Sequence, residues 1–492
     1  MIEPTEPVIY EVNTMAWLRE LSVRHGRPIT LRDVPKEDWD ELAVPGVDVV
    51  WLMGVWQRSP AGRAIALADA DLVASWRAAL PDVTENDVAG SPYCVRRYVA
   101  DDRAGGPGGL ATARAELDRR GLGLYLDYVP NHVAPDSHWL LDRPEYFIRG
   151  NAADRRRDPA AFADINGTVF ARGRDPFFPP WPDVVQLNAF SAETRAATAR
   201  VLSGIGAQCD GVRCDMAMLV TNDVFGRTWG ERAGPAPAGD FWPEVLGRVK
   251  ERHPRMTFVA EVYWDLEAEL RRQGFDHCYD KRLYDRLVHE DAGSVAEHLR
   301  ADLGYQRGLV RFLENHDEPR AAATLGTAKE RAAAVLVATL PGAALWHEGQ
   351  FTGRRVHLPV FLTRRPEEPP DTRLRTFFER LLATVRDSGL RHGDWRALTA
   401  SGWPDNGSFR GLVAFCRTTP SRRHVVVVNL GDAPAQGRIP LPWDDLAGGT
   451  WSLRDLLTDT SYTRDGGELR DPGLFVDLAP FGHHLFAIRS DG

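Results

Sequence analysis

Eight short apolar runs, separated by longer segments, recur through the first 350 residues of this 492-residue chain. Several runs are continuously hydrophobic, as expected for strands that are buried on both faces. Between them, segments such as 108–121, 192–206, 241–253 and 328–340 have apolar residues spaced three and four apart, which is typical of amphipathic helices. Alternating strands and helices predict a parallel sheet, and eight such units predict a closed (β/α)₈ TIM barrel of the α/β class. The runs are VIYEV (8–12), VDVVWLM (47–53), LGLYLDYV (122–129), CDGVRC (209–214), MTFVAEV (256–262), FDHCYD (275–280), LVRFLEN (309–315) and ALWHEG (344–349).

Two regions depart from this alternation and predict further domains. Residues 133–190 are rich in Pro, Arg, Asp and aromatic residues and lack helical periodicity. A loop of that length inside a compact domain is usually functional. After about residue 395, short alternating strands separated by Gly, Pro and Asp predict an antiparallel β domain. We therefore predict a barrel from 1–132 and 191–394, a small inserted domain at 133–190 and a C-terminal β domain at 395–492.

Polar residues follow or end four of the strand-like runs. These segments are LDYVPNH (126–132), DGVRCD (210–215), FVAE (258–261) and FLENHD (312–317), and they place Asp215, Glu261 and Asp317 at strand ends. The carboxyl ends of the parallel strands in a barrel surround one mouth, where active sites are built. We therefore expect the three carboxylates to converge there.

The same four segments resemble the four signature regions of the α-amylase superfamily of glycoside hydrolases and transglycosylases, in the family's order. GSPYCVRRY (90–98), QLN (186–188) and the strand-rich C-terminal part extend the resemblance over most of the chain. The resemblance implies that Asp215 is the nucleophile of a retaining reaction, that Glu261 is the general acid/base, and that Asp317 binds sugar hydroxyls. It also implies that the inserted segment is the family's domain B, that the C-terminal part is its domain C, and that no organic cofactor is needed.

The chemistry of the neighbouring residues agrees with these implied roles. Arg213 lies two residues before Asp215, so both side chains of the strand point to one face, where a guanidinium can orient the carboxylate and keep it ionised. Glu261 follows the apolar run MTFVA and precedes Val262, Tyr263 and Trp264. Such surroundings remove water from a carboxyl group and raise its pKa, as a general acid requires.

The resemblance also implies substrate-binding roles for further residues. His132 and His316 match positions that bond hydroxyls of the sugar at the cleavage point, Asp127 matches a bracing aspartate, and Tyr93 matches an aromatic platform for that sugar. Each of these side chains has the alternative of a structural role in the core. Asn131 matches a position that often binds a structural Ca²⁺, but we find no partner ligands for it in the sequence, and we predict no metal site.

The segment after Asp215 departs from the family pattern. Starch-cleaving members usually continue with a Lys-His pair on the leaving-group side, whereas this chain continues with MAMLVTND. We therefore predict action on short α-linked glucosides or oligosaccharides. Two alternatives stay open: transfer to phosphate or a sugar, as in sucrose phosphorylase-like or glucan transferase-like members, and a non-catalytic barrel that binds sugar.

Composition and charge exclude some classes of binding partner. The net charge of −9, with basic residues scattered among acidic ones, argues against nucleic acid and against an anionic membrane surface. The N-terminal sequence MIEPTEPVIYEV lacks the basic start and apolar run of a secretory signal, so we expect a cytoplasmic protein. Five cysteines without metal-ligand spacing predict reduced, buried thiols. The sequence does not indicate an oligomeric state.

Overall fold

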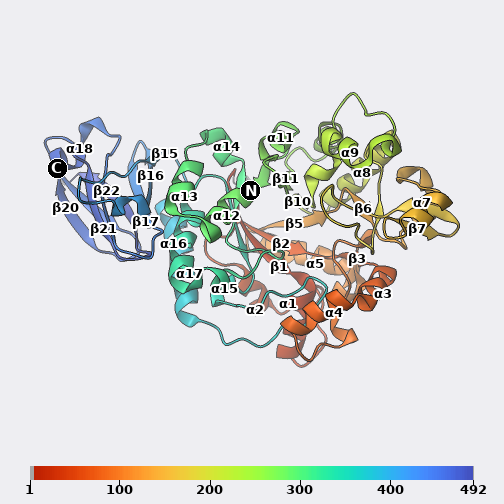
Figure 1. The fold of residues 1–492 in the computed structure, drawn as a ribbon. Coiled ribbons are helices and arrows are strands. Elements are labelled where there is room, and N and C mark those ends of the chain that lie inside the picture. Colours follow the sequence, from red (N-terminus) through yellow and green to blue (C-terminus); the bar gives the residue numbers. More distant parts are fainter. Residues whose placement is uncertain (1–4, 491–492) are drawn as a thin grey trace.

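The structure of the chain, a computed structural model, describes residues 5–490. In Figure 1 the parallel barrel occupies the centre, the C-terminal sheet lies at one end, and the segment that contains β7 and α7 lies at the other. Within these residues, no helix combines the length and the apolar character needed to cross a lipid bilayer.

The predicted eight-stranded parallel barrel is confirmed. The strands close in the order β1-β14-β13-β12-β11-β10-β5-β2. Each of the eight apolar runs of the sequence contributes one strand. The strands are β1 (Val8–Asn13), β2 (Val49–Met53), β5 (Gly123–Tyr128), β10 (Gly211–Cys214), β11 (Thr257–Ala260), β12 (His277–Tyr279), β13 (Leu309–Arg311) and β14 (Ala343–His347).

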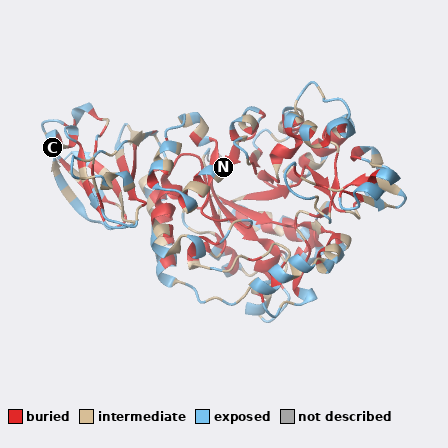
Figure 2. Cartoon of the chain, in the orientation of Figure 1, coloured by how far each residue is buried: buried red, intermediate tan, exposed pale blue. Residues whose placement is uncertain are grey.

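Burial on both faces explains the continuous hydrophobicity of these strands. In β2, Val49, Trp51 and Met53 belong to a cluster that fills the barrel interior, whereas Val50 and Leu52 pack toward the surrounding helices. Figure 2 shows the strands as a buried centre under helices whose outer faces are exposed. The interior is therefore a packed core, and a site can be built only at its ends.

Helices follow the barrel strands and cover them, and the four segments with helical periodicity all lie in helices. After β2, an antiparallel pair of strands, β3 (Trp56–Arg58) and β4 (Val95–Ala100), lies among the helices. The helices of the barrel are α1 (Thr14–Arg24), α2 (Lys36–Leu42), α3 (Pro60–Ala68), α4 (Ala70–Ala79), α5 (Gly106–Arg119), α8 (Ala192–Gly206), α9 (Asn222–Trp229), α10 (Phe241–Lys250), α11 (Glu267–Arg272), α12 (Lys281–His289), α13 (Ala292–His298), α14 (Leu303–Arg307), α15 (Ala321–Thr324), α16 (Gly326–Thr339) and α17 (Thr372–Ser388).

The segment between β5 and α8 contains short elements around a small apolar cluster of its own. Two antiparallel strand pairs, β6 with β9 and β7 with β8, organise it. Its elements are β6 (His132–Val133), α6 (Trp139–Asp142), α7 (Ala152–Arg157), β7 (Phe162–Ile165), β8 (Thr168–Ala171) and β9 (Val185–Gln186).

The C-terminal part is antiparallel, as predicted. A six-stranded sheet, in the order β15-β16-β17-β22-β19-β20, packs with the pair β18-β21 around a second hydrophobic cluster. In β17, Val425 and Val427 belong to this cluster while Val426 and Val428 face the barrel's core, which joins the two domains. The elements are β15 (Asp394–Leu398), β16 (Leu412–Thr419), β17 (Arg422–Asn429), β18 (Ala435–Ile439), β19 (Thr450–Asp455), β20 (Ser461–Asp465), α18 (Gly466–Arg470), β21 (Leu474–Leu478) and β22 (His483–Ser490).

Candidate active site

Asp215 and Glu261 lie side by side because their strands pair in parallel. Cys214, the last residue of β10, is in register with Ala260, the last residue of β11. The next residue of each strand is therefore the carboxylate, and the backbone N–H of Glu261 donates to the carbonyl of Cys214 (3.0 Å). Both side chains are buried, as is Cys214. All five cysteines are buried and none forms a disulfide within residues 5–490, in agreement with the prediction of reduced core thiols.

Arg213 joins the two carboxylates. One terminal nitrogen, Nη1, lies 2.7 Å from Oδ1 of Asp215, and the other, Nη2, lies 2.7 Å from Oε2 of Glu261. Nη2 is also 3.9 Å from Oδ2 of Asp317. The guanidinium stands over the rings of Trp51, Tyr93 and Tyr279, at 5.1 to 5.7 Å from their centroids. These aromatic faces hold the cation in place and keep water from it.

Glu261 is held by two further donors. The backbone N–H of Met216 donates to Oε2 (2.6 Å), and the hydroxyl of Tyr263 donates to Oε1 (2.8 Å). Met216 reaches this geometry with φ of 42°, a left-handed conformation that is uncommon for a non-glycine residue and is often found at functional sites. Burial raises the pKa of Glu261 to about 7, although Arg213 opposes the effect. A carboxyl group with this pKa can carry a proton near neutral pH.

Asp215 experiences the same two influences, burial and Arg213. Burial raises its pKa above the ordinary value, and the charge and the hydrogen bond of Arg213 both act against burial. The direct contact with Nη1 favours the ionised carboxylate.

Asp317 lies beyond its strand, because β13 ends at Arg311, earlier than the sequence run suggests. The side chain of Asn315 accepts the backbone N–H groups of Asp317 and Glu318 (2.9 and 2.8 Å) and fixes the turn. His316 Nε2 is 2.9 Å from Oδ2 of Asp317. Removal from water favours the neutral acid, but the charge and the hydrogen bond of His316, together with the charges of Arg213 and His357, outweigh it and lower the pKa of Asp317 to about 2.

The structure brings most of the predicted substrate-binding residues to the same mouth. The hydroxyl of Tyr93 is 2.7 Å from His316 Nε2. Asp127 is buried below them and accepts hydrogen bonds from the backbone of Gly54 (2.8 Å) and the indole of Trp51 (3.1 Å), which is the geometry of a brace.

His132 lies in β6 at the side of the mouth. Its ring packs against Trp181, with the centroids 5.3 Å apart, and burial lowers its pKa to about 4, so the ring is neutral. No ion pair links it to the carboxylates within residues 5–490. The roles of all these residues stay predictions.

Three groups that bond residues of the site were not predicted from the sequence. Glu11 on β1 contacts His316 Nδ1, and Nε2–H of His357 donates to the carbonyl of His316 (2.7 Å). The backbone of Met216 has no signal in the sequence. A charged residue within the apolar run VIYEV was the available sign for Glu11. Among the residues after Glu261, Tyr263 is the one that bonds the carboxyl, whereas Trp264 is 38 % exposed.

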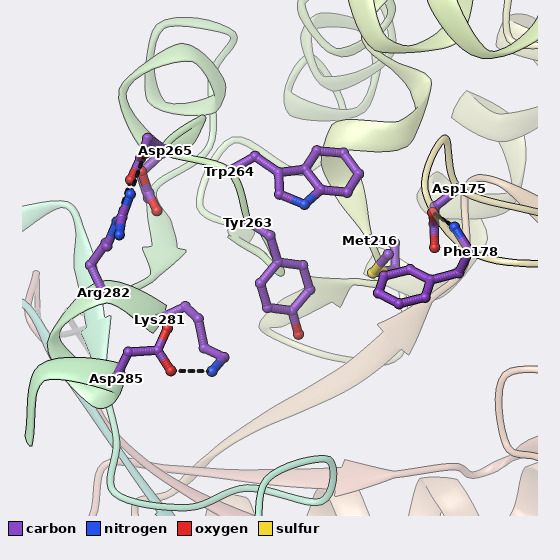
Figure 3. Close-up of a pocket in the computed structure, with 10 residues that line it drawn as sticks. Asp175, Phe178, Met216, Tyr263, Trp264, Asp265, Lys281, Arg282 and Asp285 are labelled. Atoms are coloured by element: carbon purple, nitrogen blue, oxygen red, sulfur yellow. Dashed lines mark hydrogen bonds and ion pairs between the residues drawn. The ribbon is translucent and has the colours of Figure 1, made fainter. Parts of the chain in front are cut away.

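A pocket of about 470 Å³ adjoins Glu261 on the side of Met216 and Tyr263. In Figure 3, the pairs Arg282–Asp265 and Lys281–Asp285 lie at one end, Met216 and Phe178 lie at the other, and Tyr263 and Trp264 lie between them. Phe177, Phe178 and Trp264 are exposed aromatic side chains, and the rings of Phe177 and Trp264 meet edge to face at 4.9 Å. The pocket thus combines apolar faces with charged groups at its rim.

The donors near Asn131 do not fit a calcium ion. Its side-chain oxygen accepts a hydrogen bond from Gln186 (2.8 Å). Across the described part of the chain, no three His, Cys, Asp or Glu side chains gather in a way that could hold a metal ion. Ca²⁺ needs about six to eight oxygen ligands, usually including carboxylates.

Comparison with known proteins finds relatives among α-amylases and glucan branching enzymes. No family model matches the chain. The chain is 26% identical over 397 residues to the α-amylase MalA of Haloarcula japonica, an alignment that covers 76% of this chain and 53% of the relative. It is 24% identical over 270 residues to the 1,4-α-glucan branching enzyme GlgB 2 of Xanthomonas campestris, covering 53% of this chain and 30% of that enzyme. These similarities support the assignment of the chain to the α-amylase superfamily.

Solved structures show the same fold along the whole chain. The maltogenic α-amylase AmyB of Thermotoga neapolitana matches with a TM-score of 0.70 and 18% identity over 99% of both chains. The acarbose complex of an α-amylase from Geobacillus thermoleovorans matches with a TM-score of 0.68 and 16% identity over 99% of both chains. The curated relatives are longer: this chain spans about half of one and about a third of the other.

Proposed function

We propose that the protein is a retaining α-glycoside hydrolase or transglycosylase that acts on short α-linked glucosides through a covalent glycosyl-Asp215 intermediate. The observation that carries the proposal is the pair of carboxyls on one guanidinium, with Asp215 and Glu261 each 2.7 Å from Arg213 and a pKa of about 7 on Glu261. Retaining glycosidases need two carboxyls about 5 to 5.5 Å apart, one ionised and one protonated.

In the first step, an oxygen of Asp215 attacks the anomeric carbon while the glycosidic C–O bond breaks. The proton of Glu261 goes to the departing oxygen, which leaves as an alcohol. In the second step, Glu261 removes a proton from water or from a sugar hydroxyl, whose oxygen attacks the anomeric carbon and releases Asp215. Asp317, Tyr93 and His316 hold the hydroxyls of the glycosyl unit during both steps.

The pocket beside Glu261 is the place for the departing group, because Met216 and Tyr263 both line it and bond Glu261. Four carboxylates line it: Asp175, Asp265, Glu267 and Asp285. The two basic residues there, Lys281 and Arg282, are already engaged by Asp285 (2.5 Å) and Asp265 (2.6 Å). An excess of negative charge repels phosphate. This charge balance favours water or a neutral sugar as the acceptor and disfavours the sucrose phosphorylase-like alternative.

The size and lining of the pocket favour a short leaving group. Pockets of about 300 to 1,000 Å³ enclose a ligand of drug size, which is comparable to one or two sugar rings. The faces of Phe178 and Trp264 suit the apolar face of a pyranose. The names of the relatives, an α-amylase and a branching enzyme, agree with an α-linked glucan or oligosaccharide as the substrate class.

A substrate panel tests the proposal. Maltose, isomaltose, sucrose, trehalose and maltooligosaccharides are incubated with the protein, with and without phosphate, and proton NMR follows the first-formed product. We expect release of the α-anomer, unaffected by phosphate. Asp215→Asn removes the nucleophile and keeps the shape of the side chain, so it should abolish turnover in a folded protein. First release of the β-anomer, or normal turnover by Asp215→Asn, would contradict the proposed mechanism.

A further inference from the structure

We infer that Glu11 is a positioning residue of the active site, which holds His316 in its doubly protonated form and thereby fixes Asp317 and Tyr93 around the sugar at the cleavage point. Glu11 itself lies behind His316 and does not face the substrate. The inference rests on the proposed function for its catalytic consequence, whereas the protonation of His316 can be measured without any substrate.

The position of Glu11 is unusual for an ionisable residue. It lies within β1, in register with Trp51 on β2 and His347 on β14, and its side chain is fully buried (0 % exposed). One oxygen, Oε1, contacts His316 Nδ1, while Oε2 has no hydrogen-bond partner among the described residues. A buried carboxylate with an unused oxygen destabilises a fold. Its presence in an otherwise apolar strand is therefore better explained by the site than by the stability of the barrel.

His316 is enclosed by acceptors on both sides of its ring. Nδ1 faces Glu11, and Nε2 faces Oδ2 of Asp317 (2.9 Å) and the hydroxyl of Tyr93 (2.7 Å). A neutral imidazole has one N–H, so it can satisfy one carboxylate only, whereas an imidazolium donates to both. Burial alone would lower the pKa of His316, but the carboxylates of Asp317 and Glu11 outweigh it and raise that pKa well above the ordinary value.

Other charged groups surround this pair. Asp127 on β5 adds negative charge, and Arg213 on β10 adds positive charge near Asp317. His357 bonds the carbonyl of His316, and His347 on β14 is neutral because burial and Arg320 lower its pKa well below the ordinary value. Within residues 5–490, the ion pairs of the His316 ring are those with Glu11 and Asp317. Removing the charge of Glu11 therefore removes one of the two carboxylates that stabilise the imidazolium and leaves Asp317 as the other.

Glu11→Gln keeps the shape of the side chain and removes its charge. The pKa of His316 should then fall, so that the ring loses a proton at neutral pH. Its one remaining N–H can then face either residue 11 or Asp317, and the ion pair with Asp317 is lost. We expect kcat at pH 7 to fall by about tenfold or more, and the alkaline limb of kcat to move by about one pH unit or more toward acid. Activity should return as the pH is lowered. KM should change less than kcat, because Glu11 does not touch the substrate.

The kinetic experiment uses an aryl α-glucoside with a good leaving group, so that protonation of Glu261 contributes little to the alkaline limb. Glu11→Asp keeps the carboxylate and should restore the wild-type limb at least in part. Glu330→Gln is the matched control, because Glu330 is also a fully buried carboxyl (0 % exposed) but lies on α16. Its substitution should leave the pH profile unchanged. If Glu11 had a structural role only, Glu11→Gln would lower stability and activity together, and the alkaline limb of the kcat–pH profile would not move.

The decisive measurement is the titration of His316 by NMR with ¹⁵N-labelled histidine, its signals assigned by their loss in His316→Gln. We expect a doubly protonated ring at pH 7 in the wild type and a lower midpoint in Glu11→Gln. A neutral His316 at pH 7 in the wild type overturns the inference even if Glu11→Gln does not fold. An unchanged midpoint in a folded Glu11→Gln overturns it as well. If no glycoside is turned over but the titration midpoint of His316 moves as expected, the pairing of Glu11 with His316 is supported and the proposed function is contradicted.

Discussion

Glu261→Gln tests the charge state that the site imposes on Glu261. Burial raises the pKa of this residue from 4.5 to about 7, so the folded protein holds the proton more tightly than the unfolded chain does. Stability is then lost as the pH rises from the unfolded value to the folded value. At about 1.4 kcal/mol per pH unit, the gap between 4.5 and about 7 corresponds to about 3 kcal/mol.

Gln resembles the protonated carboxyl and cannot ionise, so the variant avoids this loss. Urea unfolding of the wild type and of Glu261→Gln, followed by tryptophan fluorescence between pH 4.5 and pH 8, measures the difference. We expect the variant to gain stability relative to the wild type across this range, by up to about 3 kcal/mol, and then to level off. Turnover of substrates with poor leaving groups should fall by about 10²- to 10⁴-fold.

A difference in unfolding free energy that does not change with pH would refute this reasoning. It would mean that Glu261 has the same proton affinity in the folded and unfolded chains, and that it is ionised in the working enzyme. If the variant instead becomes less stable relative to the wild type as the pH rises, folding lowers the pKa of Glu261. Glu261 would then be an ionised partner of a structural ion pair.

Three further predictions use other residues or substrates. The carboxyl of Glu330 has no hydrogen-bond partner among the described residues, and burial raises its pKa from 4.5 to about 8, so Glu330→Gln should gain stability relative to the wild type between pH 4.5 and about pH 8 with activity unchanged. Thermal unfolding and kcat measure this, and a variant less stable than the wild type at pH 8 would contradict it. Azide should rescue Glu261→Gln on an activated aryl α-glucoside, because neither a proton donor nor a base is then needed; equal losses on all substrates without rescue would count against the acid/base role. Since the pocket accepts a short leaving group, kcat/KM should level off after two or three sugar units, and a steady rise from maltose to soluble starch would overturn this preference.

The sequence was sufficient to predict the barrel and the pairing of Arg213 with Asp215. Strand alternation places Arg213 and Asp215 on one face, and parallel pairing places Asp215 level with Glu261. Both deductions use the geometry of single strands and of adjacent strands, which a run of residues specifies directly. The position of Asp317 was harder to predict, because its strand ends early and a turn held by Asn315 carries it to the mouth.

The remaining features depend on contacts between distant parts of the chain. Met216 donates through its backbone, so its side chain gives no indication of the role. Tyr263 and Trp264 are adjacent aromatic residues, and only the conformation of the loop decides which of them bonds Glu261. Glu11 and His316 are 305 positions apart, and their contact arises because β1 closes the barrel near β13.

The single guanidinium between the two carboxyls has a consequence for the proposed reaction. Before the first step, Asp215 is an anion and Glu261 is neutral; after it, the glycosyl ester has removed the charge of Asp215 and Glu261 has become the anion. Both sites lie 2.7 Å from Arg213, one at each terminal nitrogen. The negative charge thus moves across one planar cation whose own surroundings of three aromatic rings stay fixed. Because the total charge next to Arg213 is the same at the beginning and the end of the step, neither the cation nor water has to rearrange while the bond is broken.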